Sequence, residues 1–151
     1  MMLARFQIEH MDAILPHLRQ EHVDAIQALG YDTFRGQIEQ ALSNSVILTF
    51  MDHNGDPVAV FGAAKRWEGC ASCWGMVTNK VDKSPVSFLR ASRRGMGYIR
   101  DILGLRRFDA TVRADNSMNM KWLIWLGFKL EGLLESYGPA GEDHFLLARV
   151  W

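Results

Sequence analysis

Residues 116–128 read NSMNMKWLIWLGF, and this stretch says most about the fold. Asparagine is a favoured N-cap residue, so Asn116 is placed to start a helix. The apolar pairs Trp122-Leu123 and Trp125-Leu126 are typical of a helix that packs in a core. We predict a helix over Asn116–Leu126, followed by a strand over Lys129–Leu134.

Upstream of this helix, a long crossover joins two further strands. A strand over Ala71–Thr78 precedes a helix that Ser84-Pro85 opens, because serine favours the N-cap and proline fits the first helical position. The helix runs to Leu103, Gly104 ends it, and a strand follows over Phe108–Arg113. Such a passage implies one parallel pair in an otherwise antiparallel sheet. A helix N-terminus at the carboxyl end of a parallel pair is a place to bind an anion.

The rest of the chain adds helices to the N-terminal part and strands at both ends. Residues 52–56, DHNGD, are of types that strongly favour a turn, and they lie between two predicted strands, so we predict a hairpin. Pro16 is tolerable in the first turn of a helix and otherwise kinks it, and Gly30 is a natural C-cap. We predict strands over Leu3–Glu9, Val46–Met51, Pro57–Lys65 and His144–Val150, and helices over His10–Gly30 and Phe34–Leu42.

Length and composition favour one domain over residues 1–151, and the predicted order of strands and helices makes it an α+β domain. A chain of 151 residues suits one domain, and 23% charged with 11% aromatic residues is a globular mixture. No apolar run reaches the ~18 residues of a membrane span, and the N-terminus lacks a signal-peptide apolar region. Two cysteines do not make a secreted disulfide framework, so we expect a cytoplasmic protein. Cys70 and Cys73 form a lone C-x-x-C entering a strand and are expected to be ordinary core cysteines, and we expect no metal site.

The charge is balanced overall but unevenly distributed. Lys and Arg number 17 and so do Asp and Glu. Residues 80–113 carry nine cations and three acids, a net +6, so the remainder carries −6. On the crossover helix, Phe88, Gly95, Ile99 and Ile102 share one face, and the arginines fill the opposite face. That face is either solvated or in contact with phosphates or an acidic partner. Nucleic acid is not expected, because no aromatic residues interleave with the arginines.

Short motifs in a fixed order cover nearly the whole chain. Asn116, a helix, Leu126-Gly127-Phe128 and Glu131-Gly132 resemble the pattern of the GNAT acyltransferases, which are acetyl-coenzyme A-dependent N-acetyltransferases. The whole chain resembles more closely a GNAT-like family of short-tailed bacteriophages. The residues that carry this closer resemblance are Leu18-Arg19, Val23-Asp24, Ile26, Gly55-Asp56-Pro57-Val58-Ala59, Phe61-Gly62, Trp74, Phe88-Leu89-Arg90-Ala91-Ser92-Arg93, Trp122-Leu123 and Gly138-Pro139-Ala140-Gly141.

The resemblance implies a GNAT-type fold, acetyl-CoA as co-substrate and an amine acceptor, either a small molecule or a protein such as a host protein. Acids on or near the acceptor side, among them Asp24 and Glu142, favour a cationic amine. A homodimer is a further possibility, and a phage protein would work in the host cytoplasm or the virion. We assign Asp115 and Asn116 as catalytic residues. The cofactor-binding residues are assigned as Val77, Thr78, Asn79, Lys83, Ser84, Arg90 and Asn116, with Lys80 near the phosphates.

Two departures from the family pattern favour a rival function. The family's glycine-rich phosphate loop is missing, and Gly95 and Gly97 read instead as mid-helix glycines that cost about 1 kcal/mol each, offset by close helix–sheet packing. Leu123 stands where many members carry a tyrosine that protonates the leaving thiolate. The rival is an inactive phage protein that acts by binding, as a virion component or on a host protein. Candidate general bases are Glu68, Asp115, Glu135 and His144, each of a type that is usually a surface group.

Overall fold

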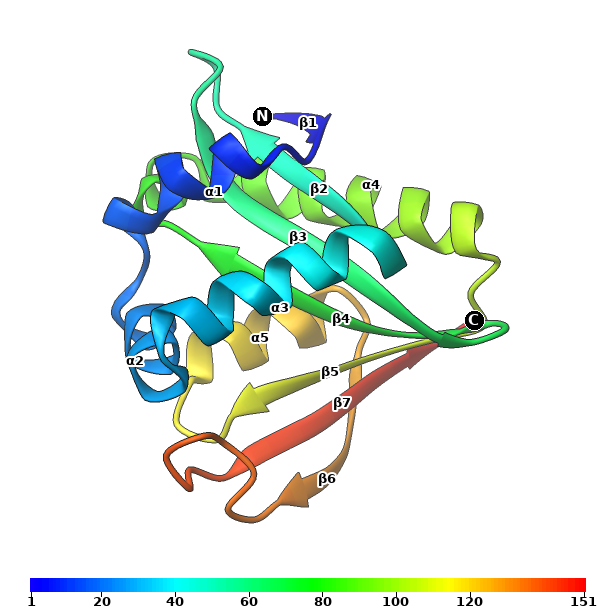
Figure 1. Cartoon of the computed structure of the whole chain (residues 1–151). Helices are drawn as coiled ribbons and strands as arrows, with labels where there is room; N and C mark the ends of the chain where they lie inside the picture. Colours follow the sequence, from blue (N-terminus) through cyan, green and yellow to red (C-terminus); the bar gives the residue numbers. More distant parts are fainter.

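One seven-stranded sheet runs through the molecule in the order β1-β2-β3-β4-β5-β7-β6 (Figure 1). The computed structural model describes residues 1–151. Every neighbouring pair is antiparallel except β4 and β5, which are parallel as expected. The strands are β1 (Met2–Arg5), β2 (Ser45–Met51), β3 (Pro57–Trp67), β4 (Cys70–Val77), β5 (Arg107–Arg113), β6 (Lys129–Leu134) and β7 (His144–Val150).

Five helices and two short 3-10 turns connect these strands. The 3-10 turn at Asn79–Lys83 was not predicted. The helices are α1 (Ile8–Ile14), α2 (Gln20–Leu29), α3 (Tyr31–Asn44), α4 (Pro85–Leu103) and α5 (Ser117–Trp125), and the other turn is Leu15–His17.

The N-terminal prediction was wrong in two places. The strand predicted over Leu3–Glu9 ends at Arg5, and α1 begins at Ile8. The helix predicted over His10–Gly30 is two helices separated by the turn Leu15–His17. Pro16 explains the break, because its ring fixes φ and it has no N–H to donate. Leu18 then turns extended and forms an isolated bridge with Thr78, which ties this break to the end of β4.

Glycine ends two helices where the sequence predicted it. Gly30 follows α2 with a φ of +86°, and Gly104 follows α4 with a φ of +58°. A left-handed backbone is almost free of cost only for glycine, so both positions stop a helix. The predicted start of α4 at Ser84-Pro85 is also right, although the Ser84 side chain makes no capping hydrogen bond. Ile102 does not join the buried face of α4, since it is 53% exposed.

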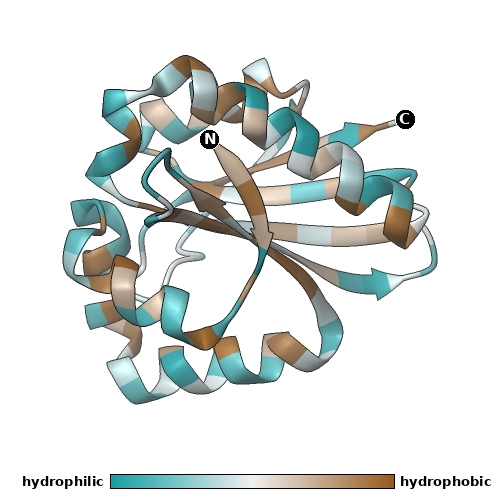
Figure 2. Ribbon diagram, turned by 90° about the horizontal axis from the view of Figure 1, so that it is seen from above, coloured by the Kyte–Doolittle hydropathy of each residue, from teal (hydrophilic) through white to brown (hydrophobic).

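Helices cover both faces of the sheet (Figure 2). The larger core cluster lies between the sheet and α4 and α5, and Phe88, Ile99 and Leu123 belong to it. The smaller cluster lies under α1, α2 and α3. No helix is both long enough and apolar enough to cross a membrane. The candidate site lies where the sheet opens, between these two layers of helices.

Candidate functional site

The sheet opens between β4 and β5. The two strands pair only over Cys70–Ser72 and Arg107–Asp109, and beyond these residues they diverge toward α2 (Figure 1). A hydrogen bond closes the narrow end, where the Ser72 hydroxyl donates to Asp109 Oδ1 at 2.6 Å. The two strands therefore splay apart beyond these residues. It leaves one edge of β4 without a neighbouring strand.

Backbone groups of β4 face this opening. The Thr78 N–H donates to the Val58 carbonyl of β3. Because the groups of an antiparallel strand alternate in direction, those of Gly75 and Val77 point away from β3 and into the opening. The Val77 carbonyl accepts the Arg19 N–H at 3.1 Å. The N–H groups of Gly75 and Val77 are thus positioned to donate to a ligand carbonyl.

A small cavity of about 70 Å³ lies in the opening itself. Trp122, Leu123 and Asn119 of α5 line it on one side, and His22 of α2 lines it as well. His22 Nε2 and Trp122 Nε1 are buried and have no hydrogen-bond partner. Burial lowers the pKa of His22 below its ordinary value. Unpaired buried polar atoms are rare in folded proteins. Two of them at one opening suggest that a polar ligand supplies their hydrogen-bond partners.

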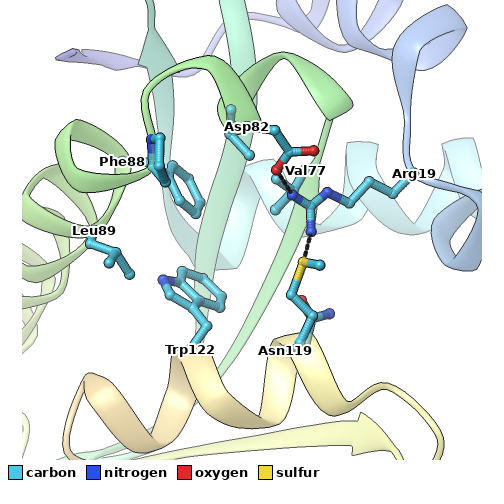
Figure 3. A pocket seen from close by; sticks show the side chains of 10 residues that line it. Arg19, Val77, Asp82, Phe88, Leu89, Asn119 and Trp122 are labelled. Atoms are coloured by element: carbon cyan, nitrogen blue, oxygen red, sulfur yellow. Dashed lines mark hydrogen bonds and ion pairs between the residues drawn. The ribbon is translucent and has the colours of Figure 1, made fainter.

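A second cavity, of about 150 Å³, continues from the first and shares Val77, Asn119 and Trp122 with it. We call it the slot (Figure 3). Phe88 of α4 and Trp122 of α5 stack with their ring centroids 5.5 Å apart and line one side. The predicted residue Val77 lies at its base and is buried. An apolar slot with a few polar atoms fits a slender, amide-bearing chain.

An ion pair crosses the mouth of the slot. Figure 3 shows the Arg19 guanidinium between the carboxylate of Asp82 and the sulfur of Met118. Arg19 is 11% exposed in this position, and its Nε is buried without a partner. Asp82 comes from the 3-10 turn between β4 and α4. The pair therefore links the start of α2 to the end of β4 and narrows the entrance.

Beyond the mouth lies a polar pocket of about 480 Å³, which Asn79, Asp115 and Asn116 help to line. Asn116 caps α5 as expected, since its Oδ1 accepts the Asn119 N–H at 3.0 Å. Its Nδ2 lies 3.5 Å from Glu21 Oε1. Asp115 accepts two hydrogen bonds from Arg113, at 3.0 and 2.6 Å. These bonds hold the pKa of Asp115 below its usual value, which weakens it as a base.

The structure divides the predicted cofactor residues among several places. Lys83 and Ser84 line a separate cavity of about 250 Å³, between the start of α4 and the β2–β3 turn. Thr78 is fully buried, and its hydroxyl donates to the Val58 carbonyl at 2.8 Å. Arg90 is exposed and lines none of the cavities described above. Of the predicted set, Val77, Asn79 and Asn116 lie in or beside the slot and its mouth.

Sequence reasoning missed Arg19, His22 and Trp122 as site residues. Arg19 is the N-cap of α2 and His22 lies three positions later in its first turn, a helical spacing that could have been noticed. What brings them to the opening is the break after Leu15–His17, which sets the direction of α2. Among the suggested bases, Glu68 pairs with Lys65 in the turn before β4. Glu135 is exposed.

His144, the remaining candidate base, lies on β7 opposite Arg113. Neither of its ring nitrogens has a hydrogen-bond partner, although both are buried. Its Nε2 is 3.7 Å from Glu142 Oε1, and its ring packs against Tyr137. None of the cavities described above includes His144 in its lining. The residue therefore lies apart from the slot and the opening.

Aromatic residues do lie against the arginines of α4, although they do not interleave with them in the sequence. The Arg93 guanidinium is 5.2 Å from the centroid of Trp125. Arg100 lies 5.7 Å from the ring centroid of Trp151, and Arg149 of β7 lies 5.0 Å from the same centroid. Part of the basic face is therefore engaged in cation–π contacts with the protein's own tryptophans.

Cys70 and Cys73 are buried and free, as expected for core cysteines.

Comparison with solved structures shows the fold. The chain is similar to a spermidine N-acetyltransferase from Vibrio cholerae in complex with CoA and spermine, with a TM-score of 0.77 and 11% identity over 99% of this chain and 94% of that one. A putative phosphinothricin N-acetyltransferase has a TM-score of 0.76 and 15% identity over 99% and 97%. The ribosomal-protein-alanine N-acetyltransferase from Brucella melitensis has 0.75 and 12% over the full length of both chains.

At these identities the likeness concerns the fold alone. The α+β fold is therefore the GNAT acyltransferase type, as the sequence resemblance implied. No protein-family model matches the chain. No curated protein matches its sequence significantly.

Proposed function

We propose that the protein transfers an acetyl group from acetyl-CoA to the amine of an acceptor. One observation carries the proposal: the opening between β4 and β5 combines an unpaired strand edge with the buried, unpartnered Trp122 Nε1 and His22 Nε2. The fold supports it, because proteins of the same fold are N-acetyltransferases and one holds CoA and spermine.

The residues of the slot suit the arm of this co-substrate. A pantetheine arm carries two amides, and amide carbonyls need donors when they leave water. The indole N–H of Trp122 and the N–H groups of Gly75 and Val77 are such donors. Phe88 and Trp122 would cover the methylene groups of the arm. The slot and the smaller cavity are less roomy than the ~300 Å³ of a typical ligand site, so binding requires the Arg19–Asp82 pair to move.

The reaction itself is a displacement at the thioester carbonyl. The acceptor nitrogen bonds to the carbonyl carbon, the carbon–sulfur bond breaks, and the thiolate leaves. Negative charge on the carbonyl oxygen is greatest in between, and backbone N–H groups at the β4 edge would stabilise it. Leu123 lines this opening and is buried, so the position where the family often has a hydroxyl is apolar here.

The phosphates of the co-substrate have two candidate positions. Lys83 and Ser84, with Lys80, surround the cavity at the start of α4, but Asp52 and Asp56 line it too. At the mouth of the slot, Arg19 is the nearest cation, and Asp82 already neutralises it. Carboxylates oppose the phosphates at both positions. We therefore expect the arm to contribute more of the affinity than the phosphates do.

We propose a cationic amine as the acceptor. Glu21, Asp82 and Asp115 line the polar pocket beyond the mouth, together with Arg19 and Arg113. The acids therefore outnumber the arginines by one. The pocket lies at the wide end of the opening, where an acceptor could reach the thioester. Small amines and the N-terminal amine of a protein both fit this description.

Calorimetry with acetyl-CoA tests the proposal. We expect binding to the wild type. Trp122→Phe keeps an aromatic ring but removes the indole N–H, and it should weaken binding about 2- to 12-fold, the value of one hydrogen bond. Trp125→Phe is the matched control on the same helix, because Trp125 lies outside the slot, and it should bind like the wild type. Thiol release with spermidine, phosphinothricin and an alanine N-terminal peptide then reports transfer.

The rival function is a phage protein that keeps the fold and acts by binding, in the virion or on a host protein. The small cavity and the ion pair across the mouth favour this alternative. No heat and no thermal shift at millimolar acetyl-CoA would support it and refute the transferase. Acetyl-CoA binding with no thiol release in the presence of any of the amines would indicate a CoA-binding protein and would also refute acetyl transfer.

A further inference from the structure

We propose that His22 is the general base that takes the proton from the acceptor amine. This inference rests on the proposed acetyl transfer and assigns a residue to one step of it, the removal of the amine proton. His22 Nε2 is buried and unpartnered, and the ring lines the cavity between β4 and β5 together with Gly75 and Val77. In the tautomer that carries its proton on Nδ1, Nε2 has its lone pair available to accept a proton.

The position of His22 places it on the acceptor side of the sheet. The slot is lined chiefly by the turn after β4, by α4 and by α5, so the thioester approaches from that layer. His22 comes from α2, which packs over the other face with α1 and α3. An amine arriving from the α2 side would meet the thioester at the opening. His22 would then lie beside the attacking nitrogen.

The charge state of His22 also suits a base. Burial is the largest influence on its pKa and lowers it, and Arg19 acts in the same direction while Glu21 opposes them. The only other titratable side chain lining the cavity is Cys73, and burial raises the pKa of its thiol, so it stays neutral. At neutral pH the imidazole is therefore uncharged and can accept a proton.

The proton count balances with His22 in this role. An amine arrives as an ammonium ion and must lose one proton before its lone pair can attack, and His22 Nε2 accepts that proton and passes it to solvent. The nitrogen loses its second proton as the carbon–sulfur bond breaks. That proton ends on the departing thiolate, so the products are an amide and a free thiol.

The competing carboxylate is less suited to this step. Asp115 is exposed and doubly hydrogen-bonded to Arg113, which lowers its pKa. It lines the polar pocket beyond the mouth and not the cavity between the strands. A base must reach the proton it removes, and geometry decides before pKa does.

The test compares His22→Gln with His17→Gln, a matched control at an exposed histidine of the preceding turn. For His22→Gln we expect kcat/KM at pH 7 to fall about 10²- to 10⁴-fold, with the acidic limb of its pH profile lost. Acetyl-CoA affinity should change by no more than the about 2- to 12-fold that one hydrogen bond is worth, so most of the loss should lie in the chemical step. His17→Gln should behave like the wild type. Imidazole added to His22→Ala should restore part of the rate, which a purely structural role would not allow.

Nuclear magnetic resonance gives a readout that is independent of turnover. The His22 ring of the wild type should titrate below the ordinary histidine pKa of about 6.5, and the acidic limb of kcat/KM should follow it. A His22→Gln variant with unchanged kcat/KM and the same limb would overturn the assignment while leaving the transferase intact. If the wild type does not bind acetyl-CoA, both the proposed transferase function and the assignment of His22 are refuted.

Discussion

Gly95 and Gly97 make a test of packing within one helix. Both lie in α4, where glycine costs about 1 kcal/mol relative to alanine. A Cβ added at Gly97 meets nothing within 4 Å, whereas one at Gly95 lies 3.3 Å from Leu48 Cδ1 and 3.6 Å from Leu3 Cδ1. The sequence suggested that close helix–sheet packing offsets the cost of glycine in this helix. That packing is present at Gly95 and absent at Gly97.

Gly97→Ala should therefore stabilise the protein by about 1 kcal/mol, which corresponds to a rise in Tm of about 2–4 °C for a chain of this size. Gly95→Ala gains the same propensity but compresses Leu48, and overpacking a core costs about 1–3 kcal/mol. We expect its net effect to be neutral to about 2 kcal/mol destabilising.

Urea denaturation of both variants measures the difference in the free energy of unfolding. With a urea m-value of about 1–3 kcal/mol/M, Gly97→Ala should raise the midpoint by about 0.3–1 M with no change in slope. The midpoint of Gly95→Ala should stay the same or fall. Equal stabilisation by the two substitutions would refute the reasoning, because it would mean that α4 does not press on β1 and β2 at Gly95.

Three further predictions concern the opening and its surroundings. Asp109→Ala removes the acceptor at the narrow end of the opening and should cost about 1–3 kcal/mol in urea denaturation, because that carboxylate is buried; a cost below about 0.5 kcal/mol would contradict it. Gly62→Ala places a Cβ 2.5 Å from the Trp74 ring and should displace that indole, costing about 1–3 kcal/mol and changing the near-ultraviolet circular dichroism. Asp115→Asn should be less stable than the wild type at pH 7. Because Arg113 lowers the pKa of Asp115, that difference should fade as pH falls below about 4, and a difference that persists at pH 2 would contradict the assignment.

The candidate site was only partly predictable, and the 3-10 turn after β4 shows why. Lys83 and Ser84 follow Asp82 directly in the sequence, yet Asp82 lines the slot while the other two line the cavity at the β2–β3 turn. A 3-10 turn rotates successive side chains by about 120°, so neighbours in the sequence face different sides. Without knowing that this turn exists, the sequence cannot separate them.

The functional histidine shows a second limit. Nothing in the neighbouring sequence distinguishes His22 from His17, because both follow Pro16 in a stretch with helical spacing. Their difference arises from α2, which points one toward the opening while the other stays exposed. The burial of the His22 ring depends on residues more than 50 positions away in the chain, such as Gly75 of β4.

The sequence by itself determined what depends on local chemistry. Gly30 and Gly104 end helices because of their own backbone freedom, and residues 52–56 turn because of their own side chains. The order of strands and helices follows from such signals together with hydrophobic spacing, and it was enough to indicate the parallel pair and the fold.

Only the tertiary structure decided where the polar groups meet. The break at Pro16 becomes part of the site because Leu18 pairs with Thr78 and Arg19 pairs with Asp82. Both contacts join segments about 60 residues apart, and their energy depends on distance and on exclusion of water, which no local pattern encodes. The basic segment 80–113 illustrates the same point, since Arg93 lies against the ring of Trp125, while Arg107 and Arg113 pair with Glu131 and Asp24 of other segments.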